Sequence, residues 1–283
     1  MIVAEAVTAL FVPGDRPDRF GKAAAAGADL VIIDLEDAVV VDHKEAALQS
    51  AVAALAPGHQ DHLRAMIRIN ALSGSRLAAE LSALRDLVER DGHGLVGLII
   101  PKAEDPGLIT DLINSLRTAS STPIGLVALI ESARGLQRVD ELAAAPGVTR
   151  LGLGEIDLAL DVGCDADAAA IGYARGRMVL ASRAAGITPP LASPAVEIRD
   201  LDAVGAAARL DRRDGFGGKL CIHPAQLDPV RAGFVPTAAE LAWARSIVDA
   251  DGGAAQVEGR MIDRPMVVRA RRILSYDNTG SRD

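Results

Sequence analysis

The chain has 283 residues, of which 49% are hydrophobic, 24% are charged and only 2% are aromatic, and its formal net charge is −8. Such a chain is poorly suited to bind nucleic acid or anionic membranes, because both attract basic surfaces and nucleic-acid bases stack on aromatic rings. The size and composition are those of a globular protein that buries enough apolar surface to fold without disulfides.

The beginning of the chain and its cysteines bear on its location. The first residues, MIVAEAVTALFVPG, include Glu5 and no basic segment, so they do not resemble a signal peptide. No apolar run reaches the ~20 residues that a membrane-spanning helix requires. Cys164 and Cys221 share no ligand spacing with a histidine, which favours free thiols in a reducing compartment. We therefore expect a cytoplasmic enzyme without a membrane partner.

Short apolar segments alternate with helical patterns along the chain. Their apolar residues are mostly consecutive, which is typical of parallel strands that are buried on both faces. The predicted strands cover residues 8–14, 28–37, 65–70, 97–104, 123–132, 149–157, 186–193 and 217–224. The seventh strand is the least regular, because Pro189, Pro190 and Pro194 interrupt it.

Helical patterns fill the intervals between these strands. Asp15 can cap a first helix that has Pro17 in its first turn and stops at Gly27. Residues 77–90 and 167–185 are long enough to connect parallel strands by helices. The alternation predicts an α/β fold, a (β/α)8 TIM barrel. An open doubly wound sheet is the alternative, but no G-x-G-x-x-G motif follows the first strand.

A further segment follows the eighth strand. Thr237 and Glu240 form a capping box that begins a helix running to about Asp249. A glycine-rich stretch, DGGAAQVEG, and the motif MIDRP come before a last helix over residues 266–275. We therefore divide the chain into a barrel over residues 1–230 and a C-terminal helical extension over residues 231–283. We expect the extension to pack on a neighbouring subunit, because the barrel is complete without it.

The predicted strands are aliphatic along their length but end in polar residues. The carboxyl ends of the strands of a (β/α)8 barrel meet at the face that carries the active site. Buried charges are unfavourable unless they are paired or bind a metal, and Mg²⁺ relieves repulsion between converging carboxylates. Any one of these residues could equally be a structural ion pair. The polar residues at the strand ends are Arg16, Asp34, Glu36, Asp37, Arg68, Asn70, Lys102, Glu131, Glu155, Asp157 and His223.

Several motifs follow one another along nearly the whole chain. They are LFVPGDRPDRFGKAAAAGADLVIIDLEDAV (residues 10–39), RIN (68–70), PKAE (101–104), ALIESARG (128–135), LGLGEIDL (151–158), CIHPAQL (221–227), LAWAR (241–245) and MIDRP (261–265). Together they resemble the citrate lyase β-subunit-like proteins of the HpcH/HpaI aldolase and citrate lyase superfamily. Each motif alone is weakly specific, whereas the ordered set is specific.

The resemblance implies a fold, a metal and a set of site residues. The fold is a (β/α)8 barrel whose C-terminal segment packs on a neighbouring chain, with a homotrimer expected. The metal is Mg²⁺, or Mn²⁺ in its place, held by Glu131 and Asp157. Arg68 is implied to contact the substrate, and Asp263 of the neighbouring chain to act as an acid or base in catalysis.

Two departures from the superfamily pattern refine this implication. The resemblance also implies that Glu36 and Asp37 line the same site, where they contact water molecules bound to the metal. In the pyruvate-type class II aldolases of the superfamily, a catalytic histidine follows the acidic residue, whereas Asp37 stands there in this chain. This difference favours the thioester lyases. An aspartate often stands on strand seven where this chain has Ala192, which leaves the acyl group of the substrate open.

The function implied is a lyase that cleaves or forms a β-hydroxyacyl thioester such as malyl-CoA, citramalyl-CoA or a citryl thioester. The products would be a 2-oxo acid and acetyl-CoA, so coenzyme A is part of the substrate. Arg68 would stabilise the enolate oxygen, and Arg16 and Lys102 are predicted to contact the substrate. The alternatives are a class II aldolase acting on free 2-oxo acids, a non-catalytic acyl-CoA-binding protein and a subunit of a citrate lyase complex.

Some of these residues have plainer interpretations. A basic groove at the mouth of the barrel would favour coenzyme A, and Arg16, Arg19 and Lys22 are its candidates, although they could form a solvated helix face. Asp263 precedes Pro265 and is also placed to cap the last helix. Lys44 is predicted to be an ordinary surface charge.

Overall fold

The structure is a computed structural model that describes residues 2–58, 63–250, 256–257, 260–261 and 263–279. The chain divides into two compact units, Met1–Arg231 and Ala232–Asp283, and we describe each by itself. Among the described residues, no helix has both the length and the apolar composition needed to cross a membrane.

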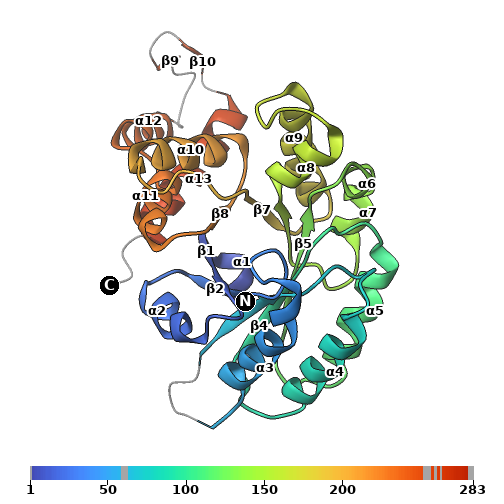
Figure 1. The fold of residues 1–283 in the computed structure, drawn as a ribbon. Helices are drawn as coiled ribbons and strands as arrows, with labels where there is room; N and C mark the ends of the chain where they lie inside the picture. Colours follow the sequence, from blue (N-terminus) through green and yellow to red (C-terminus); the bar gives the residue numbers. More distant parts are fainter. Residues whose placement is uncertain (1, 59–62, 251–255, 258–259, 262, 280–283) are drawn as a thin grey trace. The chain divides into compact units, whose positions relative to one another are not determined.

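The first unit is a closed barrel of parallel strands in chain order, in which the last strand pairs with the first. The predicted (β/α)8 fold is thereby confirmed (Figure 1). The strands are β1 (Thr8–Pro13), β2 (Leu30–Asp34), β3 (Ala65–Arg68), β4 (Leu95–Ile100), β5 (Gly125–Ile130), β6 (Arg150–Leu153), β7 (Thr188–Ala192) and β8 (Gly218–Cys221).

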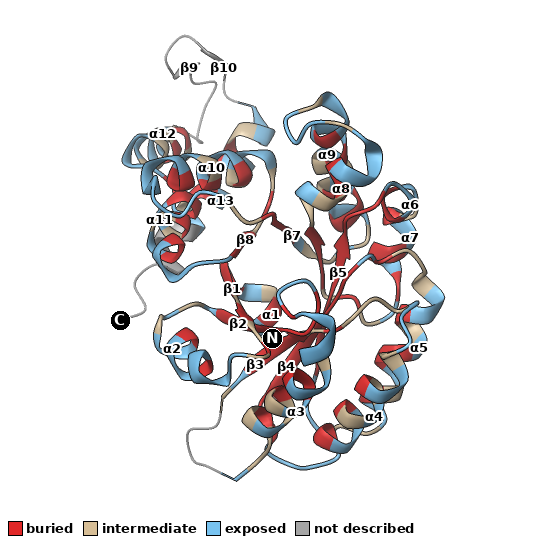
Figure 2. Ribbon diagram, viewed as in Figure 1, coloured by how far each residue is buried: buried red, intermediate tan, exposed pale blue. Residues whose placement is uncertain are grey.

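Helices surround this barrel. Figure 2 shows the strands as the buried centre of the unit, while the helices turn exposed faces outward. The helices are α1 (Ile2–Glu5), α2 (Phe20–Ala25), α3 (Lys44–Leu55), α4 (Leu77–Val88), α5 (Pro106–Arg117), α6 (Ala133–Gln137), α7 (Val139–Ala144), α8 (Glu155–Val162), α9 (Ala169–Ala184) and α10 (Leu201–Asp214), and α11 (Leu227–Phe234) crosses the boundary between the units.

Two local predictions were wrong. The sixth strand ends at Leu153, and Glu155 and Asp157 lie in the first turn of α8, where acidic side chains are favoured by the helix dipole. Asp15 does not cap the first helix, because its carboxylate is paired with the ring of His43, with 3.0 Å between Oδ2 and Nδ1. Arg16 stands at the N-cap position and makes no side-chain capping bond.

The prolines of β7 interrupt its pairing with β6 without abolishing the strand. The register shifts between the pairs Arg150–Thr188 and Gly152–Leu191. A proline has no N–H to donate but keeps its carbonyl. The carbonyl of Pro189 accepts a hydrogen bond from Arg150 Nε, and the carbonyl of Pro190 accepts one from the N–H of Gly217 at 3.0 Å.

The second unit is built on two packed helices, α12 (Ala238–Asp249) and α13 (Arg264–Thr279), with a short antiparallel pair, β9 (Gln256–Val257) and β10 (Arg260–Met261). The predicted capping box is confirmed, since Thr237 Oγ1 accepts from the N–H of Glu240 and Glu240 Oε2 accepts from the N–H of Thr237. Its core consists of Ala244, Ile247, Val267, Ala270 and Ile273. Arg269 lies over the ring of Trp243, 5.1 Å from its centroid.

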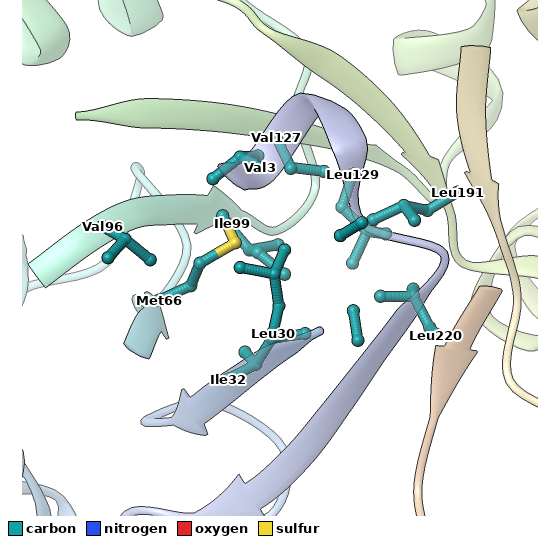
Figure 3. Packing of buried hydrophobic residues seen from close by; sticks show 12 residues of the cluster. Val3, Leu30, Ile32, Met66, Val96, Ile99, Val127, Leu129, Leu191 and Leu220 are labelled. Carbon is teal, nitrogen blue, oxygen red and sulfur yellow. The ribbon is translucent and has the colours of Figure 1, made fainter. Parts of the chain in front are cut away.

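The N-terminal helix α1 contributes Val3 to the barrel core. Val3 is fully buried, and Figure 3 shows it among strand side chains that include Val127 and Ile99. A Cβ at Gly125 would lie 2.8 Å from Val3 Cγ2, so the glycine makes room for the valine. The first residues therefore complete the packing of the barrel.

This packing predicts the effect of truncating Val3. We expect Val3→Ala to lower the free energy of unfolding by about 2 kcal/mol, because two buried methyl groups and their contacts are lost. The matched control is Val41→Ala, because Val41 is 68% exposed and should change stability by less than ~0.5 kcal/mol. Urea denaturation measures the free energy of unfolding of both variants, provided that its dependence on urea concentration is unchanged. If the two variants lost the same free energy of unfolding, Val3 would not stabilise the barrel.

Candidate active site

Three barrel strands carry a charged residue just beyond the apolar core, on the same face of the strand. Residues two apart along a strand point to the same side, so core positions lead directly to a polar layer at the carboxyl end. These same-face residues are Leu30, Ile32 and Asp34 on β2, Met66 and Arg68 on β3, and Val127 and Leu129 on β5 followed by Glu131. The barrel therefore brings the predicted residues of strands two, three and five to one end.

Arg68 is held by a bidentate ion pair with Asp34. Its Nε and Nη2 donate to the two carboxylate oxygens, each at 2.7 Å. Nη1 lies 3.0 Å from Glu36 Oε2 and 3.4 Å from Asp37 Oδ2, and the guanidinium covers the ring of Phe11 at 4.9 Å from the centroid. Burial lowers the pKa of Arg68, but the hydrogen bonds and charge of Asp34 outweigh burial and raise it above its ordinary value. Arg68 is a fixed, permanently charged group.

Asp34 also shapes the turn that carries the two acidic residues after β2. Its carboxylate accepts hydrogen bonds from the N–H groups of Glu36 at 2.9 Å and Ala38 at 3.0 Å. Asp34 is 1% exposed, so one buried carboxylate fixes both the turn and Arg68. The sequence predicts Asp34 as a polar strand end but not its role in holding Arg68 and the turn.

Lys44 supports the same turn, and its prediction as an ordinary surface charge was wrong. Its Nζ donates to the carbonyls of Leu35 and Glu36, both at 2.7 Å, and to Asn70 Oδ1 at 2.8 Å. Asn70 donates in turn to Glu80, from its N–H at 3.0 Å and from its side chain. The lysine follows strand two by ten residues, and no local signal in the sequence reveals the fold that returns it there.

Lys102 faces the acidic residues of two other strands. Its N–H donates to Glu131 Oε1 at 2.7 Å, and its ammonium lies 2.9 Å from Glu36 Oε1 and 3.8 Å from Glu131 Oε1. Burial lowers the pKa of Lys102, but the hydrogen bond to Glu36 and the nearby carboxylates raise it overall. The ammonium therefore stays charged and contacts carboxylates of the protein.

Glu131 has the features of a metal ligand. The residue is 3% exposed, and its Oε2 is buried without a hydrogen-bond partner among the described residues. Burial, and then the charge of Glu36, raise the pKa of Glu131 to about 7. A Cβ at Gly154 would lie 2.6 Å from Oε2, so the glycine leaves the space that this oxygen occupies.

Asp157 completes the predicted pair from the first turn of α8. After burial and the charge of Glu36, its negative charge is a further cause of the raised pKa of Glu131, and both side chains line one pocket. The start of α8 is held by Ser193, whose Oγ accepts from the N–H of Glu155 at 2.7 Å and donates to the carbonyl of Leu153 at 2.7 Å. Arg175 lies 3.5 Å from Glu155 Oε1 on the other side.

A small pocket of about 90 Å³ joins these groups. Arg68, Glu131 and Asp157 line it with Ser193, whose hydroxyl is already bonded twice within the protein. The remaining wall is largely apolar and includes Phe11, Leu129, Leu153, Pro194 and Leu220. Ala192, at the position where an aspartate is often expected, is fully buried. The pocket has room for a small polar fragment over an apolar floor.

The donor set suits a hard cation. Within the described ranges, no group of three or more His, Cys, Asp or Glu side chains is arranged to hold a metal. The predicted ligand set consists of two carboxylates, those of Glu131 and Asp157. Mg²⁺ is commonly held by one or two carboxylates, with waters and substrate oxygens in the other positions. The buried Oε2 of Glu131, which no described residue bonds, lines the same pocket as Asp157 and fits this arrangement.

Two of the remaining predicted residues of the first unit, Arg16 and His223, make their printed side-chain contacts outside this cluster. Arg16 is exposed and pairs with Asp18, with 2.9 Å between Nε and Oδ1, and Arg19 and Lys22 are also exposed. His223 accepts from the N–H of Ala225 and caps a short helical turn. Asp263 belongs to the second unit.

Asp263 caps α13 with its side chain, since its Oδ1 accepts from the N–H of Met266 at 2.9 Å. The plainer interpretation of Asp263 as a helix cap is therefore observed. Its predicted catalytic role is not tested by this contact.

Comparison with known proteins identifies the family of the chain. The model of the family "HpcH/HpaI aldolase/citrate lyase" matches residues 8–224. A citrate lyase subunit beta-like protein of Mycobacterium tuberculosis is 35% identical over 277 residues, covering 94% of this chain and 93% of that protein. The L-malyl-CoA/beta-methylmalyl-CoA lyase of Cereibacter sphaeroides is 30% identical over 299 residues, covering 94% and 92%.

A solved structure gives the same result for the fold. The crystal structure of CitE from Mycobacterium tuberculosis in complex with magnesium, acetoacetate and coenzyme A matches with a TM-score of 0.79 and 33% identity. The match covers 97% of this chain and 99% of that one. The resemblance inferred from the ordered motifs is thereby confirmed.

The raised pKa of Glu131 predicts that metal binding depends on pH. A cation binds the ionised carboxylate, and near or below about pH 7 part of Glu131 is protonated in the metal-free protein. We expect Mn²⁺ affinity to fall, by up to about tenfold per pH unit, as the pH is lowered below about 7. Calorimetry in buffers of different ionisation enthalpy would count the proton released.

Glu45→Gln is the matched control for this measurement, because it removes an exposed carboxylate on α3. That variant should keep the pH dependence, whereas Glu131→Gln should lose it together with most of the affinity. An affinity that stays constant between about pH 6 and 8, with no proton release, would contradict the assignment.

Proposed function

The chain belongs to the HpcH/HpaI aldolase/citrate lyase family, and we propose that it is a Mg²⁺-dependent carbon–carbon lyase acting on a β-hydroxyacyl thioester of coenzyme A. Malyl-CoA, citramalyl-CoA and a citryl thioester are the substrates of this class. Cleavage gives a 2-oxo acid and acetyl-CoA, and the reverse reaction joins them.

One observation carries the proposal. Glu131, whose buried Oε2 has no hydrogen-bond partner in the described part of the chain, lies in one pocket with Asp157 and with Arg68, a cation that cannot lose its proton. A pair of carboxylates for a divalent cation beside a fixed positive charge suits a reaction in which a chelating oxo acid and an enolate are formed together. The relatives named above include a malyl-CoA lyase and a structure that holds magnesium and coenzyme A.

The residues divide the work of the reaction. Glu131 and Asp157 would hold Mg²⁺, which when bound supplies Lewis acidity at the hydroxyl and carboxylate of the substrate. Arg68 uses Nε and one N–H of Nη2 on Asp34, and its Nη1 lies near Glu36 and Asp37. The second N–H of Nη2 and the fixed positive charge would stabilise the negative charge that develops on the thioester oxygen. Because Asp34 holds the guanidinium rigidly, little reorganisation is needed when that charge appears.

Proton transfer requires carboxylates that can carry a proton. Cleavage removes the proton of the β-hydroxyl, breaks the bond between the α and β carbons, and leaves the electron pair in the enolate. Glu36 and Asp37 are the carboxylates available to accept the hydroxyl proton, and burial raises the pKa of Glu36. Asp263 of a neighbouring chain would protonate the enolate carbon.

The coenzyme would lie at the mouth of the barrel. Arg16, Arg19 and Lys22 form an exposed basic segment after β1, where the phosphates of coenzyme A could bind. The class II aldolase alternative needs no such phosphate contacts, and a subunit of a citrate lyase complex would present the same site to a carrier-bound thioester.

A substrate panel tests the proposal. We expect the protein with Mg²⁺ to release acetyl-CoA from at least one of malyl-CoA, citramalyl-CoA and citryl-CoA, and to lose this activity with EDTA. Glu131→Gln and Asp157→Asn should each lower turnover by at least ~10²-fold, because a metal ligand is removed while the shape is kept. The two products, acetyl-CoA and the 2-oxo acid, are measured separately.

Asp111→Asn on α5 is the matched control, because its carboxylate lies outside the metal pocket. Cleavage of free β-hydroxy 2-oxo acids with no activity on thioesters would favour the aldolase. Thioester binding without any cleavage would favour a non-catalytic acyl-CoA-binding protein.

The role of Asp263 leads to a prediction about assembly. We propose a homotrimer in which Asp263 reaches the site of the adjacent chain, since a barrel that is complete at β8 does not need the second unit for closure. Mixing inactive Arg68→Ala and inactive Asp263→Ala proteins under subunit exchange should restore part of the activity, because some mixed sites hold both residues. No recovery despite demonstrated exchange, or an active monomer, would contradict a shared site.

A further inference from the structure

Lys102 has an unusual backbone conformation. Across the described part of the chain it is the one non-glycine residue with positive φ, at 46°. A side chain with a Cβ is disfavoured in this left-handed region, where glycine is the ordinary residue and asparagine or aspartate the usual exceptions. Such strain persists where the surrounding structure uses it, and it is concentrated at functional sites. Lys102 directly follows Pro101 at the carboxyl end of β4.

The positive φ of Lys102 accompanies two hydrogen bonds from this turn to β5 and the residue that follows it. Beyond β4, the N–H of Lys102 donates to Glu131 Oε1 at 2.7 Å, and the next N–H, of Ala103, donates to the carbonyl of Leu129 at 3.1 Å. The first bond occupies one oxygen of Glu131 and leaves Oε2 without a partner within the described structure. The backbone of Lys102 therefore determines which carboxylate oxygen of Glu131 is available to a cation.

The side chain of Lys102 has a separate effect. Its ammonium lies between two carboxylates that repel each other, 2.9 Å from Glu36 Oε1 and 3.8 Å from Glu131 Oε1. Glycine at this position would remove the strain but also the positive charge. Because the side chain is 45% exposed, the ammonium can turn toward solvent without crossing packed structure.

We propose that Lys102 is a positioning residue of the metal site: its left-handed backbone orients Glu131, and its ammonium is a counter-ion that a divalent cation displaces. The proposal rests on the metal site of the proposed function and gives Lys102 a role other than substrate contact. The ammonium and the cation compete for the same negative charge, so the ammonium opposes metal binding while the backbone N–H supports it.

Three substitutions separate the two effects. Lys102→Met removes the charge and keeps an unbranched side chain. Lys102→Gly removes the charge and adopts the left-handed conformation readily. Lys102→Val removes the charge and adds β-branching, which is strongly disfavoured at positive φ. The Mn²⁺ affinity of the protein without substrate is measured from the electron paramagnetic resonance signal of the free ion. This measurement does not depend on turnover.

We expect Lys102→Met and Lys102→Gly to bind Mn²⁺ about three- to tenfold more tightly than the unchanged protein, because a nearby positive charge is gone. Lys102→Val should bind about 10- to 100-fold more weakly than Lys102→Met, since the bond that orients Glu131 is lost. Arg85→Met, which removes an exposed positive charge on α4, is the control and should leave the affinity unchanged.

Each outcome decides one part of the proposal. Equal affinity in the Met and Val variants would overturn the role of the backbone, and weaker binding in the Met variant would overturn the role of the counter-ion. Circular dichroism verifies folding, and Lys102→Thr replaces the Val variant if that variant does not fold. If the unchanged protein does not bind Mn²⁺, the metal site of the proposed function fails, whereas binding with no difference between variants refutes only the role of Lys102.

Discussion

The ion pair between Arg68 and Asp34 is the interaction on which the candidate site depends. Both side chains are largely buried inside the carboxyl end of the barrel, and each charge is tolerated there because the other compensates it. Asp34 has further hydrogen bonds to the turn that carries Glu36, so the pair fixes a cation and an acidic turn together. Removing one partner of such a pair typically costs about 3–5 kcal/mol, because the other charge stays buried.

The surrounding carboxylates make the metal-free site electrostatically unfavourable. Burial and the charge of Glu36 raise the pKa of Glu131 to about 7 in the folded chain. The unfolded chain ionises Glu131 at the ordinary pKa of a glutamate, below that of the folded chain. The free energy of unfolding therefore falls as the pH rises from that ordinary pKa toward 7. Arg68 and Lys102 offset part of this repulsion. A divalent cation bound only by the folded protein would offset the rest and stabilise it by mass action.

The fold and the polar face could be predicted from the sequence because they depend on local patterns. Consecutive apolar residues mark strands buried on both faces, and the interval lengths suit crossover helices. The sixth strand was predicted too long, because helical and strand patterns overlap where Glu155 and Asp157 follow Gly154. The ordered motifs added the family, which composition and periodicity alone do not specify.

The sequence by itself determined the barrel and its polar face, and the family resemblance of its motifs implied Glu131 and Asp157 as candidate metal ligands. Only the tertiary structure decided which groups neutralise one another. Lys44 supports the turn after β2, and Lys102 contacts Glu36 from a distant strand in a strained conformation. These contacts depend on barrel closure, which brings residues far apart in the chain to hydrogen-bonding distance, and on the desolvation of buried charges, which no local pattern encodes.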